Sequence, residues 1–123
     1  MNAVLLKQVT ILDPGSAFHE ATKDILVRNG QIEAIDDELT PNEAITTINE
    51  PGSHVSLGWV DMRSHFCDPG EENKEDLISG TKAAAYGGFT HASLLPTTEP
   101  PIATKTQVQY IFGKRQSLPV EVH

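Results

Sequence analysis

The side chains best suited to chemistry lie in residues 58–70, which we expect to form a buried strand that runs into a tight turn. Successive side chains of a strand point to opposite faces, so one face would carry a polar, reactive row. That row consists of Asp61, Arg63, His65 and Cys67, and the other face is mostly apolar. Because Asp68-Pro69-Gly70 is a turn signal, we expect the strand to deliver these groups to the carboxyl end of a parallel sheet.

Of the last three members of this row, His65 and Cys67 have atoms that could bind a metal ion, and Arg63 has none. His65 alone does not make a zinc site, since such sites use at least three protein groups, so we predict a structural or vestigial role for it over a ligand role. Cys67 could be a soft ligand or a nucleophile, but with no activating neighbour in the sequence we expect a small, half-buried side chain. Arg63 has no free lone pair and stays protonated, so it cannot bind a metal ion.

The elements around this strand follow an alternating pattern. Asn73 is the expected N-cap of a helix whose inward stripe is Leu77, Ile78, Thr81, Ala84 and Ala85, and Gly87-Gly88 ends it. A strand over residues 89–95, a helix opened by the capping-box pattern of residues 104–107, and a strand over residues 119–122 follow. This order predicts two right-handed βαβ crossovers and a parallel sheet.

The first part of the chain, residues 1–53, has the pattern of a small β domain. Strands are expected over residues 4–12, 24–28, 31–35 and 44–48. Asn29-Gly30 tolerates the positive φ values of a type I′ turn and predicts a hairpin between the second and third strands. These strands look too thin to be stable alone and need a covering partner.

Further polar groups are assigned to structure or to solvent. The acids Asp68, Glu71, Glu72, Glu75 and Asp76 are interpreted as a solvated cluster at a helix N-terminus, with a cation site as the alternative. His91 is expected to be a hydrogen-bonded core histidine, or else to line a pocket. His19 and His54 are expected to be surface imidazoles.

Composition limits the classes of function. The chain has 123 residues and a formal net charge of −8, which argues against binding to nucleic acid or to anionic membranes. One cysteine excludes an internal disulfide, and no apolar run approaches the ~20 residues of a membrane span. We therefore expect a soluble, cytoplasmic protein.

The stretch around His65 resembles the first barrel strand of the amidohydrolase superfamily, and in particular the dihydroorotases. The matching residues are Pro69, Gly70, Glu72, Lys74, Glu75, Asp76, Gly80, Thr81, Ala83 to Ala85 and Gly87 to Thr90. Zinc-dependent members carry Asp-x-His-x-His here, followed by a substrate-binding arginine. In this sequence Arg63 stands at the first histidine, Cys67 at that arginine, and Thr97 at a substrate-binding asparagine.

The resemblance implies a fold and a domain division. It implies N-terminal strands of a β-sandwich over residues 1–53, followed over residues 54–123 by the first βαβαβ part of a TIM-like (β/α)8 metal-dependent hydrolase barrel. A complete barrel needs ~250 residues, so the barrel part is expected to be incomplete, as in an N-terminal fragment.

The departures at Arg63, Cys67 and Thr97 predict that zinc-dependent catalysis is lost, with no catalytic residue in this chain and no cofactor. Cys67 and Thr97 would be vestigial substrate positions, His65 a residual metal position, and Arg63 an electrostatic replacement paired with Asp61 or with a later carboxylate. The resemblance then implies a scaffold role in pyrimidine biosynthesis beside aspartate transcarbamoylase. The alternatives are part of an active zinc-dependent dihydroorotase or related cyclic-amide hydrolase that acts on C–N bonds, and an interaction module that self-associates through open sheet edges.

Overall fold

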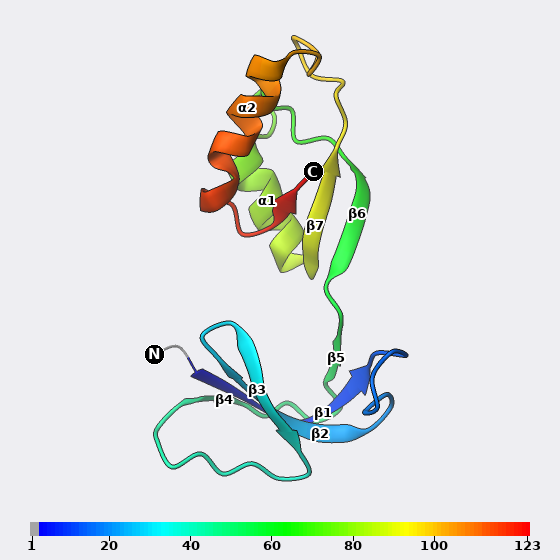
Figure 1. Cartoon of the computed structure of the whole chain (residues 1–123), viewed down its shortest axis with the longest axis vertical. Coiled ribbons are helices and arrows are strands. Elements are labelled where there is room, and N and C mark those ends of the chain that lie inside the picture. The colour runs from blue at the N-terminus through cyan, green and yellow to red at the C-terminus, as the bar shows by residue number, and fades with distance from the viewer. Residues whose placement is uncertain (1–2) are drawn as a thin grey trace. The chain divides into compact units, whose positions relative to one another are not determined.

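The computed structural model describes residues 3–123 and divides the chain into two compact units, one ending at Leu57 and the other covering Gly58–His123. Each unit has its own sheet (Figure 1). The sequence analysis placed the division after residue 53. Residues 54–57 instead lie in the first unit, because a short strand there pairs with its first strand.

The first unit is a single five-stranded mixed sheet. Its strands are β1 (Ala3–Leu12), β2 (Thr22–Arg28), β3 (Gln31–Asp36), β4 (Thr46–Ile48) and β5 (His54–Ser56). The order is β3-β2-β1-β4, with antiparallel β1, β2 and β3, while β4 and β5 both run parallel to β1. The predicted hairpin is confirmed, since Asn29 and Gly30 have φ values of 52° and 77°.

One buried carboxylate holds this sheet to the segment after β3. Asp24 is fully buried and accepts hydrogen bonds from the backbone N–H groups of Gln8 and Leu39, both at 2.9 Å. The Asp24 carboxylate also forms an ion pair with Lys7, whose Nζ lies 2.7 Å from Oδ2. Burial alone would raise the pKa of Asp24, but the hydrogen bonds from Lys7, Leu39 and Gln8 hold that pKa well below its ordinary value.

The second unit has the predicted strand and helix order. It consists of β6 (Trp59–Ser64), α1 (Leu77–Tyr86), β7 (Phe89–Leu94), α2 (Lys105–Lys114), a 3-10 turn (Arg115–Ser117) and β8 (Glu121–Val122). The three strands are parallel in the order β6-β7-β8, and Figure 1 shows both helices on the same side of this sheet. The buried residues Ala92, Val120 and Val122 form its core, against which Phe66, Ala84, Leu94 and Leu118 pack.

The structure corrects two expectations about α1. Its N-cap is Asp76, not Asn73, because the Asp76 carboxylate accepts the Ser79 N–H while Ser79 Oγ accepts the Asp76 N–H. Its buried residues are Leu77, Gly80 and Thr81, whereas Ile78 is 45% exposed. Ala85 is also exposed, so the inward stripe is narrower than predicted.

The expectation of a buried strand within residues 58–70 is wrong for most of β6. Val60 and Met62 are 57% and 83% exposed, because they lie on the sheet face away from the helices.

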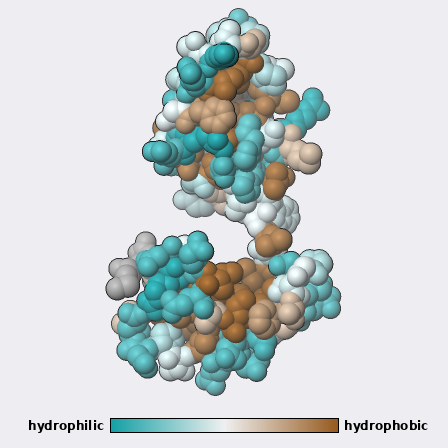
Figure 2. Space-filling view, in the orientation of Figure 1, coloured by the Kyte–Doolittle hydropathy of each residue, from teal (hydrophilic) through white to brown (hydrophobic). Residues whose placement is uncertain are grey.

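Apolar patches are visible on both units in Figure 2. Among residues 3–123, neither helix is long and apolar enough to cross a membrane.

Candidate functional site at the end of strand β6

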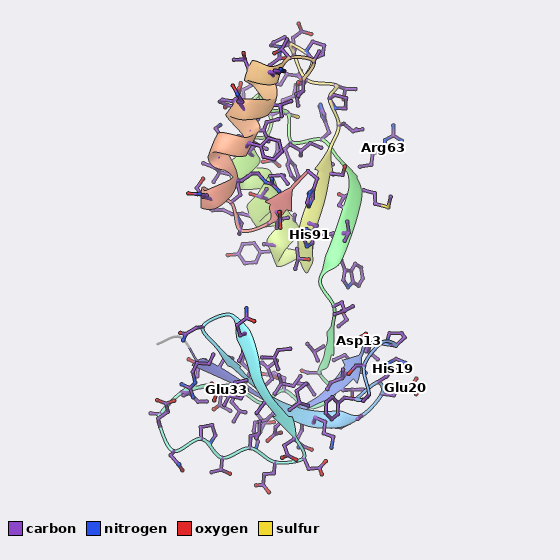
Figure 3. The ribbon with its side chains drawn as sticks, viewed as in Figure 1. Asp13, His19, Glu20, Glu33, Arg63 and His91 are labelled. Carbon is purple, nitrogen blue, oxygen red and sulfur yellow. The ribbon has the colours of Figure 1, made fainter. Side chains whose placement is uncertain are left out.

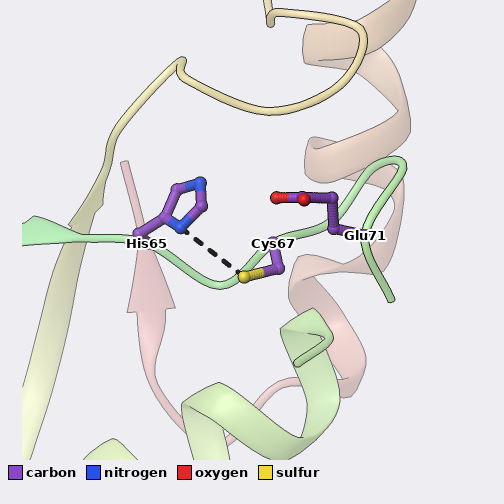
Figure 4. Close-up of side chains that lie close together, drawn as sticks. All are labelled: His65, Cys67 and Glu71. Atoms are coloured by element: carbon purple, nitrogen blue, oxygen red, sulfur yellow. Dashed lines mark hydrogen bonds between the residues drawn. The ribbon is translucent and has the colours of Figure 1, made fainter. Parts of the chain in front are cut away.

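Three potential ligand atoms converge where the chain leaves β6. His65 Nδ1 lies 3.5 Å from Cys67 Sγ, and a carboxylate oxygen of Glu71 completes a group whose atoms all lie within 4.8 Å of one another (Figure 4). A tight turn produces this grouping, since the Glu71 N–H donates to the carbonyl oxygen of Cys67 at 2.9 Å. Cys67 has a φ of 58°, so the chain has left extended geometry by this point.

The second ring nitrogen of His65 contacts the loop after β7. Nε2 lies 3.2 Å from the backbone oxygen of Thr97. A carbonyl oxygen only accepts hydrogen bonds, so Nε2 is the donor in this contact, and in the neutral imidazole Nδ1 presents its lone pair toward Cys67. The Cys67 thiol can then donate to Nδ1, and Nδ1 is the nitrogen that would bind a metal ion.

Glu71 supplies a negative charge beside this pair. It forms an ion pair with Lys74 on the same loop, and the hydrogen bond and charge of Lys74 lower the pKa of the Glu71 carboxyl. The carboxyl is therefore ionised at neutral pH. The sequence analysis favoured a solvated cluster for Glu71 and kept a cation site as the alternative, without joining this acid to His65 and Cys67. The turn signal at residues 68–70 was the available clue.

The donor set of this group fits zinc. A thiolate sulfur, an imidazole nitrogen and a carboxylate oxygen are all zinc ligands, and catalytic zinc sites use three protein ligands with one open position. His65 thus has the two further protein groups that the sequence analysis did not find for it. Thr97 contributes a backbone oxygen to His65, and its side chain is exposed.

Arg63 does not occupy this group. Its side chain is exposed and extends away from the sheet (Figure 3). Within residues 3–123, the structure shows no ion pair between its guanidinium and Asp61. The Asp61 carboxylate instead accepts the backbone N–H of Arg63 at 2.9 Å.

Asp68 departs from the predicted solvated cluster. It is 2% exposed and accepts hydrogen bonds from the Leu77 N–H at 3.2 Å and the Tyr110 hydroxyl at 2.8 Å. Lys114 Nζ lies 3.0 Å from Oδ2, the oxygen that also accepts the Leu77 N–H. Burial alone would lower the pKa of Lys114, but its hydrogen bonds to Tyr110 and Asp68 raise that pKa above the ordinary value. Asp68 therefore links the site loop to both helices.

The remaining histidines are placed as follows. His19 and His54 are exposed, as expected. His91 is hydrogen-bonded, but it contacts His123 and its side chain is 41% exposed, so it is not a core histidine. The parallel arrangement of β7 and β8 brings these two residues together, which sequence reasoning did not foresee.

Comparison with solved structures defines the class of protein. The chain matches an L-hydantoinase (dihydropyrimidinase) from Arthrobacter aurescens with a TM-score of 0.74 and 29% identity, over 99% of this chain and 27% of that chain. It matches a dihydroorotase crystal structure with a TM-score of 0.66 and 19% identity, over 99% of this chain and 30% of that chain. The fold is therefore that of the N-terminal part of hydantoinase-like and dihydroorotase-like amidohydrolases.

Sequence comparison narrows the relationship. The chain is 39% identical to a dihydroorotase of Trichlorobacter lovleyi over 114 residues, which are 93% of this chain and 27% of the relative. It is 39% identical to a dihydroorotase of Aquifex aeolicus over 118 residues, covering 96% and 28% respectively. No family model matches the sequence. The chain is thus similar to the N-terminal portion of dihydroorotases and spans about a quarter of their length, 27% and 28% in these two cases.

Proposed function

We propose that this chain serves pyrimidine biosynthesis as the N-terminal portion of a dihydroorotase-like protein, in a scaffold role without zinc-dependent catalysis. The observation that carries the proposal is Arg63, two residues before His65 on the strand that resembles the zinc-binding strand of dihydroorotases. A guanidinium has no lone pair for a metal ion and stays protonated, so it adds positive charge beside a place suited to a dication. The similarity to dihydroorotases supports the pathway.

The exposed position of Arg63 supports the loss of one zinc ligand, with no other group of this strand taking that ligand's place. Its exposed side chain extends from the edge strand β6, and the Asp61 carboxylate is engaged by a backbone N–H. The pair of histidines expected on one strand is therefore reduced to His65. In the zinc-dependent family that this strand resembles, the ion would act as a Lewis acid and activate a water at neutral pH, and a strand with one histidine would lack one of the ligands that hold it.

A second candidate function is supported by the group of His65, Cys67 and Glu71. Its three donor atoms are of the types that bind zinc, and they lie within 4.8 Å of one another. In this alternative the chain contributes to an active zinc-dependent cyclic-amide hydrolase in which Cys67 and Glu71 replace the missing histidine. Both candidates concern the end of β6 and differ in whether His65 binds zinc.

Reintroducing the missing histidine separates the two candidates. If Arg63 stands at the position of the lost ligand, the variant Arg63→His should bind one more Zn²⁺ per chain than the wild type, and this binding should require His65. The control Arg63→Gln removes the charge and adds no ligand, so it should bind no additional Zn²⁺. Calorimetric titration with Zn²⁺ measures both. Wild-type binding that disappears in His65→Gln and in Cys67→Ser would contradict the proposal and favour the hydrolase.

The scaffold role is tested with aspartate transcarbamoylase, the partner that the resemblance implies. We expect the chain to coelute with that enzyme in size-exclusion chromatography with light scattering, and to give no turnover of dihydroorotate with added Zn²⁺. Separate elution of the two proteins would reject the partner. Turnover that is lost in His65→Gln would reject the absence of catalysis.

A further inference from the structure

A second cluster of ligand groups lies on the open face of the three-stranded sheet, away from the β6 site. Its members are His91 on β7, Glu121 on β8 and His123 directly after β8. The nitrogen and oxygen atoms that they offer lie within 4.8 Å of one another. Neither the proposed function nor the similarity to dihydroorotases makes use of these three residues.

The strand register places all three side chains on one face. His91 pairs with Glu121, and Ala92 pairs with Val122. Ala92 and Val122 are 0% and 1% exposed and belong to the core under the helices. Side chains alternate along a strand, so His91, Glu121 and His123 occupy the opposite, open face.

The backbone fixes His123 beside β7. Its N–H donates to the carbonyl oxygen of Ala92 at 2.9 Å, and its carbonyl oxygen accepts the N–H of Leu94 at 2.9 Å. These two hydrogen bonds extend the parallel ladder past β8. Sheet pairing therefore sets the backbone position of His123.

The two imidazoles have a geometry that suits a shared metal ion. His91 Nδ1 and His123 Nε2 lie 3.0 Å apart, with the rings stacked at a centroid distance of 5.3 Å. Two nitrogens bound to one tetrahedral Zn²⁺ at 2.0–2.1 Å would be about 3.3 Å apart. A hydrogen bond between these nitrogens needs one shared proton, which a metal ion would replace.

Glu121 provides the third ligand and a negative charge. Its Oε2 lies 3.9 Å from His91 Nδ1, beyond hydrogen-bond distance, while its Oε1 accepts a hydrogen bond from Arg115 Nη2 at 2.7 Å. Arg115 also lies over the Phe112 ring at 4.6 Å, which helps to hold its guanidinium in place. Oε1 of Glu121 is thus held by Arg115, and Oε2 lies on the side of His91.

From this geometry we propose that His91, Glu121 and His123 form a binding site for a divalent transition metal ion of the zinc type. Two imidazole nitrogens and one carboxylate oxygen make a set of three protein ligands, which leaves a fourth position open. The site is distinct from the group at the end of β6. It shares no residue with that group, so it does not depend on the function proposed above.

The test is calorimetric titration of the 123-residue chain with Zn²⁺. We expect saturable binding whose affinity falls at least about tenfold in His91→Gln and in His123→Gln, as expected for loss of a metal ligand. His54→Gln, in the other unit, is the matched control and should bind as the wild type does. His65→Gln should also retain this equivalent, which separates the site from the one at β6.

A second measurement does not depend on substitutions. In histidine-selective NMR spectra of the wild type, Zn²⁺ should shift the imidazole signals of His91 and His123 together. In Cys67→Ser, cobalt(II) should still bind at this site, because Cys67 is not a ligand here. Absence of saturable Zn²⁺ binding, shifts at His65 alone, or unchanged affinity in the double variant His91→Gln/His123→Gln would overturn the proposal.

Discussion

The imidazole of His65 joins two loops, since its Nε2 lies 3.2 Å from the backbone oxygen of Thr97, 32 residues further along the chain. The first loop follows β6 and the second follows β7, and the strands themselves are neighbours. The contact with this carbonyl needs a proton on Nε2, and in the same ring orientation Nδ1 faces Cys67. A polar contact between loops thus determines the chemistry available at the β6 end.

Replacing His65 should loosen the loop after β7. In His65→Leu the Thr97 carbonyl loses its donor, so we expect faster hydrogen exchange of the amides in residues 96–103. Exchange with mass-spectrometric detection measures this. His19→Leu, an exposed histidine in the other unit, is the control, and equal exchange in both variants would show that the contact does not order the loop.

Asp24→Asn should strongly destabilise the first unit. The substitution removes the charge that Lys7 and two backbone N–H groups compensate at a fully buried position, and breaking such a buried pair costs about 3 kcal/mol. Urea unfolding measures the loss. Asp37→Asn breaks the exposed ion pair with Lys23 and should cost at most about 1 kcal/mol; a similar cost for both variants would contradict this account.

The same carboxylate should make stability depend on acid pH. The pKa of Asp24 is lowered in the folded state, so its contribution is fully present above its ordinary pKa of 3.8 and is lost as pH falls below that value. The free energy of unfolding of the wild type should therefore decrease below about pH 4 more steeply than that of Asp24→Asn. Parallel pH profiles would show that Asp24 is not responsible.

Tyr110→Phe should weaken the link between α2 and the site loop. It removes the hydroxyl that donates to buried Asp68 at 2.8 Å, and the loss of such a hydrogen bond to a charged group costs about 1.5–3 kcal/mol. Thermal and urea unfolding measure the change. Tyr86 is 93% exposed, so Tyr86→Phe should leave stability unchanged. Equal effects of the two variants would argue against the link.

Two glycines in helices should respond to alanine with opposite signs. At Gly80 an added Cβ would lie 2.4 Å from the Phe66 ring, so Gly80→Ala should destabilise by about 1–3 kcal/mol through overpacking. At Gly113 an added Cβ would meet no atom within 4 Å beyond its chain neighbours and its own helix backbone, so Gly113→Ala should stabilise by roughly 0.5–1 kcal/mol. Stabilisation by both would mean that α1 can move away from Phe66.

Local signals allowed much of the fold to be predicted. Asn29-Gly30 gave the hairpin and Thr104 with Gln107 gave the start of α2, because both are decided by neighbouring residues. The predicted N-cap of α1, Asn73, is wrong for two reasons. The Ser79 N–H donates to the carboxylate of Asp76, which makes Asp76 the N-cap, and the Leu77 N–H donates to Asp68.

The candidate sites depended on contacts that a single sequence does not reveal. Alternation indicated that His91 lies on one strand face, but the register between β7 and β8, which decides its partner, has no local signature. The burial of Asp24 likewise requires Lys7 and Leu39 from other elements. Glu71 was counted as a solvated acid because only the turn brings it to Cys67.

Asp68 follows Cys67 directly in the chain, and its carboxylate accepts hydrogen bonds from Tyr110 and Lys114 of α2. A rotation or shift of α2 would therefore pull on the peptide that carries the thiol. The position of α2 is thereby coupled to the end of β6. A molecule that binds the outer surface of α2 and displaces the helix would change the distances among His65, Cys67 and Glu71 without contacting them.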